Sequence, residues 1–167
     1  MITSIQNFFL HTLGPRWCVF FCSLLPIIEL RGAIPLGAAL GLPWWQTFLI
    51  ALVGNLLPVP FILLFIRAIL GWMKKIRGLS KIALWLEQKA DAKKGKIERY
   101  EYWGLLLFVA LPLPGTGAWT GSLIAALLRL DFRKSFLFIT FGVLIAGVIM
   151  TLASYGIVGF LSFLAAS

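Results

Sequence analysis

Two charged residues, Glu29 and Arg31, lie within an otherwise apolar part of the chain, in the run Pro26-Ile27-Ile28-Glu29-Leu30-Arg31-Gly32-Ala33-Ile34-Pro35. A charge in apolar surroundings is costly unless it is paired or faces water, and at membrane depth it marks a functional site by default. Residues two positions apart point to different faces of an intact helix. We therefore expect helix breaks at Pro26 and at residues 32–35, which would turn both side chains toward one cavity.

A second segment, Leu111-Pro112-Leu113-Pro114-Gly115-Thr116-Gly117, holds two prolines and two glycines within six residues and cannot continue a helix. Broken helix ends expose N–H groups that bind anions and carbonyl groups that bind cations. Thr120 and Ser122 follow as neutral hydrogen-bonding groups. The two segments predict one substrate- or ion-binding site, made of Glu29, Arg31, Gly32, Pro35, Pro112, Pro114, Gly115, Thr116, Gly117 and Thr120.

The roles of the two charges follow from their chemistry. Glu29 would couple to a proton or bind a cation, and Arg31 would bind an anion or tune the carboxylate. A structural alternative has Arg31 reaching the outer membrane interface, with Glu29 as its partner. Asn55, in the next apolar run, either caps carbonyls freed by Pro58 and Pro60 or faces the same cavity.

The elements that position these residues must be membrane helices. The chain has 167 residues, of which 60% are hydrophobic and 13% are charged. Such a composition indicates an all-α integral membrane protein. The net charge of +9 could suggest nucleic acid, but the basic residues cluster in short stretches between apolar blocks. That distribution orients a membrane protein, and we expect no nucleic-acid partner.

The distribution of basic residues indicates how the second segment enters the membrane. Thirteen of the fifteen Lys and Arg residues flank the apolar stretch from Gly104 to Leu128. Both flanks should face the cytoplasm. Each arm of this stretch rises only about 12–16 Å, half of a ~30 Å hydrocarbon core. We therefore expect a re-entrant hairpin that enters from the cytoplasm and returns to it.

The first half of the chain repeats this design. A shift of 88 residues aligns Pro26 with Pro114 and Gly54 with Gly142, and both halves show a broken hairpin followed by a full span. Two copies inserted with opposite orientation form an inverted repeat, as in many transporters. We expect a single membrane domain, 1–167, with an interfacial helix at 1–16, repeat 1 at 17–71, a cytoplasmic amphipathic segment at 72–103 and repeat 2 at 104–167.

Several chemistries lack their residues in the sequence. It contains no G-x-x-x-x-G-K phosphate loop and no His/Cys/Asp cluster with metal spacing. His11 is the only histidine, so no Ser or Cys nucleophile has a histidine base. Cys18 and Cys22, in an apolar segment, are interpreted as small buried thiols. We expect no enzymatic activity, no cofactor and no metal site.

With Glu29-Leu30-Arg31-Gly32-Ala33-Ile34-Pro35 and Pro112-Leu113-Pro114-Gly115-Thr116-Gly117, the chain resembles the small multidrug export protein family over nearly its whole length. That family looks like a distant branch of the DedA superfamily. The resemblance implies two re-entrant hairpins that meet near the midplane, with Glu29 as the acidic residue of the first. DedA-like proteins are implicated in moving lipid-linked phosphates and in proton-dependent membrane homeostasis. Many carry an arginine where this chain has Thr116, Gly117 and Trp119.

We expect a transporter of a prokaryotic plasma membrane that moves a small molecule or a lipid-linked phosphate, coupled to protons or another ion. The alternative is a non-transporting scaffold or lipid-organising protein in which Glu29 and Arg31 are paired and sealed. Expected partners are the bilayer, with anionic lipid at the inner leaflet beside residues 72–103. A second copy of the chain is another expected partner. The segments from Gly37 to Gly41 and from Gly117 to Gly121 fit the pattern G-x-x-x-G, which permits close packing within the chain or between protomers.

Overall fold

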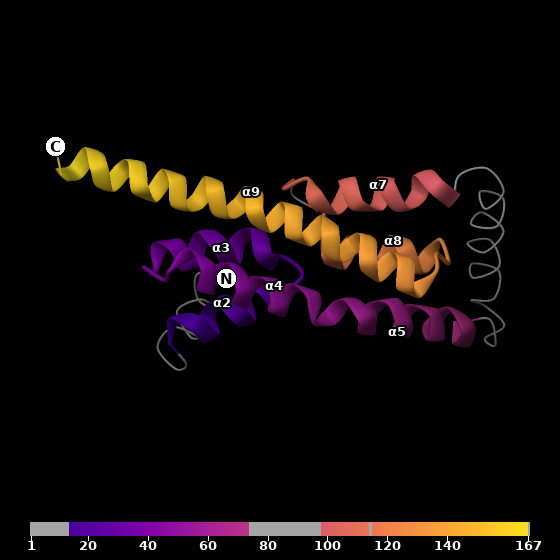
Figure 1. The fold of residues 1–167 in the computed structure, drawn as a ribbon. Helices are drawn as coiled ribbons and strands as arrows, with labels where there is room; N and C mark the ends of the chain where they lie inside the picture. The colour runs from indigo at the N-terminus through magenta and orange to yellow at the C-terminus, as the bar shows by residue number, and fades with distance from the viewer. Residues whose placement is uncertain (1–13, 74–97, 114, 167) are drawn as a thin grey trace.

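The computed structural model describes residues 14–73, 98–113 and 115–166. Within these ranges every regular element is a helix, which confirms the all-α prediction there (Figure 1). The predicted interfacial helix at 1–16 and the amphipathic segment at 72–103 fall largely outside them. The helices, in chain order, are α2 (Pro15–Leu24), α3 (Glu29–Ala39), α4 (Trp44–Leu56), α5 (Pro58–Met73), α7 (Glu98–Ala110), α8 (Ala118–Leu127) and α9 (Phe132–Ala166).

Four short helices form two hairpins, α2 with α3 and α7 with α8. They contain 10, 11, 13 and 10 residues, so each rises only about 15–20 Å at 1.5 Å per residue. The first hairpin turns at residues 25–28 and the second at residues 111–117. Figure 1 shows that the hairpins extend from opposite ends of the molecule, with their turns near its middle.

The expected helix break at 32–35 is wrong. α3 runs without interruption from Glu29 to Ala39 and contains Pro35. The ring lacks an N–H to donate to the Arg31 carbonyl, but its fixed φ is helical, so the helix continues through it. The chain breaks earlier, and Glu29 itself has a φ of 51°. The left-handed backbone conformation of Glu29, rather than a second helix break, directs its carboxylate toward the second hairpin.

Two longer helical stretches pass alongside the hairpins. Leu57 alone separates α4 from α5, so these two helices follow one another with a junction directly before Pro58, whose ring lacks the N–H that would continue the hydrogen bonding of α4. The segments Trp44–Phe65 and Phe132–Ile157, of 22 and 26 residues, are long and apolar enough to cross a membrane. Large apolar side chains on them face outward, including Phe61, Leu64 and Leu152. Such a surface is suited to lipid rather than to water.

The two halves of the chain share backbone details at the 88-residue offset. The Leu42 N–H donates to the Gly37 carbonyl, and the Leu130 N–H donates to the Ala125 carbonyl, both at 3.0 Å. The preceding residues, Gly41 and Arg129, both have positive φ, 73° and 56°. The second helix of each hairpin therefore ends in the same left-handed cap.

Packing between helices follows the same correspondence. α2 packs on α4 as α7 packs on α9, while α3 reaches across to α9 and α8 reaches across to α5. Gly54 and Gly142 are equivalent in these contacts: a Cβ would meet the Phe20 carbonyl of α2 at 2.8 Å in the first case and the Leu106 carbonyl of α7 at 2.9 Å in the second. Both glycines let a long helix approach the first helix of its own hairpin closely.

Candidate functional site

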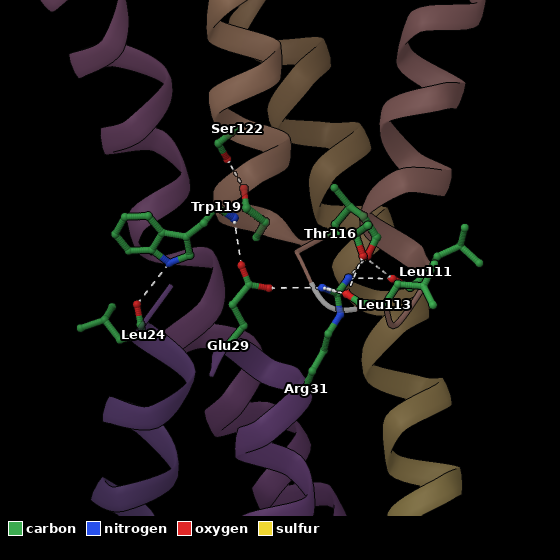
Figure 2. A network of polar contacts seen from close by, with 10 residues as sticks. Leu24, Glu29, Arg31, Leu111, Leu113, Thr116, Trp119 and Ser122 are labelled. Carbon is green, nitrogen blue, oxygen red and sulfur yellow. Dashed lines mark hydrogen bonds and ion pairs between the residues drawn. The ribbon is translucent and has the colours of Figure 1, made fainter. Parts of the chain in front are cut away.

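Glu29 and Arg31 lie at the start of α3, where the two hairpin turns meet (Figure 2). Glu29 is 6% exposed. The Arg31 Nη1 lies 3.8 Å from the Glu29 Oε2, so the two charges form an ion pair. Burying an unpaired charge would be strongly unfavourable, and each charge here offsets the other.

Arg31 extends from the first hairpin to the end of the first helix of the second. Its Nη2 donates to the carbonyls of Val109 and Leu111, at 3.1 and 2.8 Å, and its Nη1 donates to the carbonyl of Leu113 at 3.1 Å. The last carbonyls of a helix have no partner within it and carry the negative end of its dipole. Arg31 therefore caps the carboxyl end of α7.

Glu29 lies at the opposite kind of helix end. Its Oε1 accepts a hydrogen bond of 3.2 Å from the backbone N–H of Trp119, in the first turn of α8. The amino end of a helix favours a negative charge. Gly117, directly before α8, lies against the carboxylate, and a Cβ at that position would collide with it. The glycine is needed here for close approach.

Two more side chains make polar contacts at the hairpin turns, Thr116 within the second hairpin and Trp119 between the two. The Thr116 hydroxyl lies 2.8 Å from the Leu111 carbonyl and 2.9 Å from the Leu113 carbonyl, so it can donate to either. The Trp119 indole Nε1–H donates to the Leu24 carbonyl, the last residue of α2, at 3.2 Å. Each hairpin thus supplies a side-chain donor to the broken helix end of the other.

A cavity of about 460 Å³ opens beside these contacts. We call it the hairpin cavity. Its volume falls within the range of small-molecule sites. Both hairpin turns contribute to its wall, together with α8 and α9, through Pro26, Ile27, Ile28, Glu29, Arg31, Gly32, Pro112, Leu113, Gly115, Thr116, Thr120 and Met150.

Most residues that the sequence predicted for the site meet at this cavity. Gly117 lies behind Glu29 instead, against its carboxylate. Pro35 lies inside α3, away from this wall. Pro114 is outside the described residues. The apolar members of the wall, such as Ile27 and Met150, carried no signal of their own in an apolar chain.

Trp119 and Asn55 also belong to the site. Trp119 was not among the predicted site residues, although the 88-residue offset aligns it with Arg31. Asn55 is 3% exposed and borders a second, small cavity together with Glu29 and Arg31. Asn55 is not part of the wall of the hairpin cavity, so neither of the two alternatives expected for it is confirmed.

The arrangement can hold a proton or a cation at the carboxylate, and it presents neutral donors from Thr116 and Thr120. Among the described residues, no group of three or more His, Cys, Asp or Glu side chains could hold a metal ion. Cys18 and Cys22 are not in disulfides and are fully buried in the core, as expected for small buried thiols.

Comparison with known families agrees with the resemblance. Residues 29–149 match the family described as "Putative small multi-drug export protein". No match was found among the curated proteins or among the solved structures. The matched region begins at Glu29 and contains both Arg31 and the whole second hairpin. Because this match covers well over half of the chain, the protein belongs to the small multi-drug export protein family.

Proposed function

We propose that this protein is a membrane transporter that moves a small molecule or a lipid-linked phosphate across a prokaryotic plasma membrane, and that it is not an enzyme. One observation carries the proposal: a buried carboxylate, paired with a guanidinium, borders a cavity of about 460 Å³ at the meeting point of two broken-helix hairpins. The family description, which names export, supports the same class of function.

We also propose that the hairpins are re-entrant and that the two halves form an inverted repeat. Their helices are too short to cross a ~30 Å hydrocarbon core. The shared caps at Gly41 and Arg129 and the reciprocal packing of α3 on α9 and α8 on α5 support this arrangement. A kinship with the DedA superfamily would follow from the same architecture. Transporters built this way bind their substrate between the repeats.

The contacts favour different tasks for the two charges. Arg31 already donates to three carbonyls and pairs with Glu29. It therefore fits the role of holding the hairpins together and tuning the carboxylate better than the role of binding a free anion. Glu29 accepts from the backbone N–H groups of Ala118 and Trp119 at the start of α8 and has an open side on the hairpin cavity. We assign proton or cation coupling to Glu29.

The test is transport in proteoliposomes under an imposed proton gradient, with two probes: a fluorescent organic cation and a fluorescent polyprenyl phosphate. We expect gradient-dependent movement of at least one probe, and its loss in Glu29→Gln. Arg16→Ala, in the exposed first turn of α2, is the control and should transport normally. Wild-type transport by both Glu29→Gln and Arg31→Ala would rule out the site.

A non-transporting scaffold is the second candidate, and the engagement of both terminal nitrogens of Arg31 favours it. The scaffold function requires that no water enters the space between the hairpins. Single cysteines along 28–36 and 112–120, in a chain with Cys18 and Cys22 replaced by alanine, would be exposed to membrane-impermeant thiol reagents. Labelling of cavity-lining positions favours transport, whereas uniform protection from both sides favours the scaffold.

A further inference from the structure

A second cavity, distinct from the hairpin cavity, lies where five helices meet around the ion pair. Its volume is about 10 Å³. We call it the small cavity. Of the residues that the structure describes, only Glu29 and Arg31 border both cavities. The rest of its wall comes from α3, α4, α7, α8, α9 and the residue before α8, through Leu30, Asn55, Val109, Gly117, Ala118, Val143 and Ala146.

Two polar atoms of this wall's residues lack hydrogen-bond partners among the described residues. The Asn55 Oδ1 is a buried acceptor without a donor, and the Arg31 Nε–H is a buried donor without an acceptor. Buried polar groups in folded proteins are nearly always paired, with protein or with ordered water. An unpaired donor and an unpaired acceptor beside one cavity point to a ligand that accepts a hydrogen bond from the first and donates one to the second.

Size and charge restrict the class of that ligand. A cavity of about 10 Å³ corresponds to one water molecule. A cation would face the Arg31 guanidinium and the positive amino end of α8, and an anion would face Glu29. An apolar molecule would leave both polar atoms unpaired. A neutral dipolar molecule of the smallest size remains.

We propose that the small cavity binds a single water molecule, which accepts a hydrogen bond from the Arg31 Nε–H and donates one to the Asn55 Oδ1. Its second proton can point to the Glu29 carboxylate, which gives the water three polar partners. Asn55 then acts as a positioning residue. It stands two residues before Leu57, so the water links the junction of α4 and α5 to the ion pair.

The presence of the water can be tested without any transport measurement. Protein labelled with ¹⁵N-arginine is reconstituted in liposomes, and polarisation transfer from water to the Arg31 Nε is measured by solid-state NMR. Asn55→Leu puts an apolar side chain against the small cavity and removes the acceptor. Gln46→Leu is the matched control, because Gln46 has the other unpartnered buried amide oxygen on α4 and does not border this cavity.

We expect clear transfer in the wild type, an at least threefold loss in Asn55→Leu and no change in Gln46→Leu. Asn55→Ser, which is smaller and keeps a hydroxyl, should retain the transfer if the leucine variant fails to fold. Absence of transfer in the wild type would overturn the proposal, as would equal transfer in Asn55→Leu. A signal that depends on replacing Na⁺ by choline would instead assign the cavity to a cation.

The role of Asn55 in transport rests on the proposed function. Asn55→Leu should shift the pH dependence of transport, because the group that orients Glu29 and Arg31 is lost, whereas Gln46→Leu should leave the profile in place. If the protein transports neither probe but the NMR result holds, the water site stands and the transporter proposal fails. An unshifted profile in folded Asn55→Leu would overturn the positioning role.

Discussion

The two hairpins have one backbone plan but different chemistry. Both end in the same left-handed cap, at Gly41 and Arg129, and both turn near the middle of the molecule. At the 88-residue offset, however, Glu29 and Arg31 of the first hairpin correspond to Gly117 and Trp119 of the second. The first hairpin therefore carries both charges, and the second supplies the helix ends that receive them.

This difference explains why a single charged pair is sufficient at the contact between the two hairpins. Arg31 caps the carboxyl end of α7, and its counterpart Trp119 caps the carboxyl end of α2 with a neutral indole N–H. Glu29 projects toward the space that its counterpart leaves empty, because Gly117 has no side chain. A second glutamate at that position would face the first, and two like charges at this depth would repel each other.

Removal of Arg31 should have the largest effect. In Arg31→Ala, three carbonyls lose the guanidinium donor and Glu29 stays buried without its partner. We expect a loss of about 3 kcal/mol in the free energy of unfolding, near the lower end for a broken buried pair, together with loss of transport. Thermal unfolding in detergent measures it. Glu29→Gln added to Arg31→Ala should recover part of the loss, and strictly additive effects would show that the two residues do not interact.

Gly117→Ala should come next, because the new Cβ collides with the Glu29 carboxylate. Overpacking of this kind costs about 1–3 kcal/mol. Gly104→Ala is the matched control: its Cβ meets nothing within 4 Å, and alanine is the better helix former. Melting temperatures should fall in the first variant and hold or rise in the second. Glu29→Ala in the Gly117→Ala background should relieve the collision; failure to do so would contradict the contact.

Trp119→Phe probes the neutral counterpart of Arg31. It removes the Nε1–H that donates to Leu24 and keeps most of the ring, so we expect a loss of about 1 kcal/mol, clearly less than for Arg31→Ala. Trp45→Phe, at a 50% exposed ring on α4, serves as the control. Denaturant unfolding in mixed micelles compares the free energies of unfolding of Trp119→Phe, Trp45→Phe and Arg31→Ala. An effect of Trp119→Phe as large as that of Arg31→Ala would reverse the proposed asymmetry between the hairpins.

Thr116→Val should have the smallest effect on stability, about 0.5 kcal/mol, because Arg31 continues to donate to both carbonyls that the hydroxyl contacts. The fractional loss of transport in Thr116→Val should exceed its fractional loss of stability, since the residue borders the hairpin cavity. Thr140→Val, whose hydroxyl donates to Phe136 within α9, is the control. Equal transport by these two variants at equal stability would remove Thr116 from the site.

Much of the fold was predictable because local rules govern it. Proline and glycine cannot continue a helix at 111–117, and basic flanks mark the ends of apolar stretches, so the short arms of the second hairpin and the long α9 follow from composition alone. The rarity of charge in apolar surroundings likewise singled out Glu29 and Arg31. An 88-residue offset, weak as a set of identities, already related Pro26 to Pro114 and Gly54 to Gly142.

Long-range contacts decided the rest. α3 continues through Pro35, where the local pattern predicted a break, and packs against α4 and α9. The partners of Arg31 lie 78–82 residues away along the chain, and Glu29 reaches Trp119 over 90 residues. The sequence alone determined that a carboxylate and a guanidinium would stand among broken helices. Only the tertiary structure decided which helix end each charge caps, because a helix dipole acts only on groups that the fold brings to its terminus.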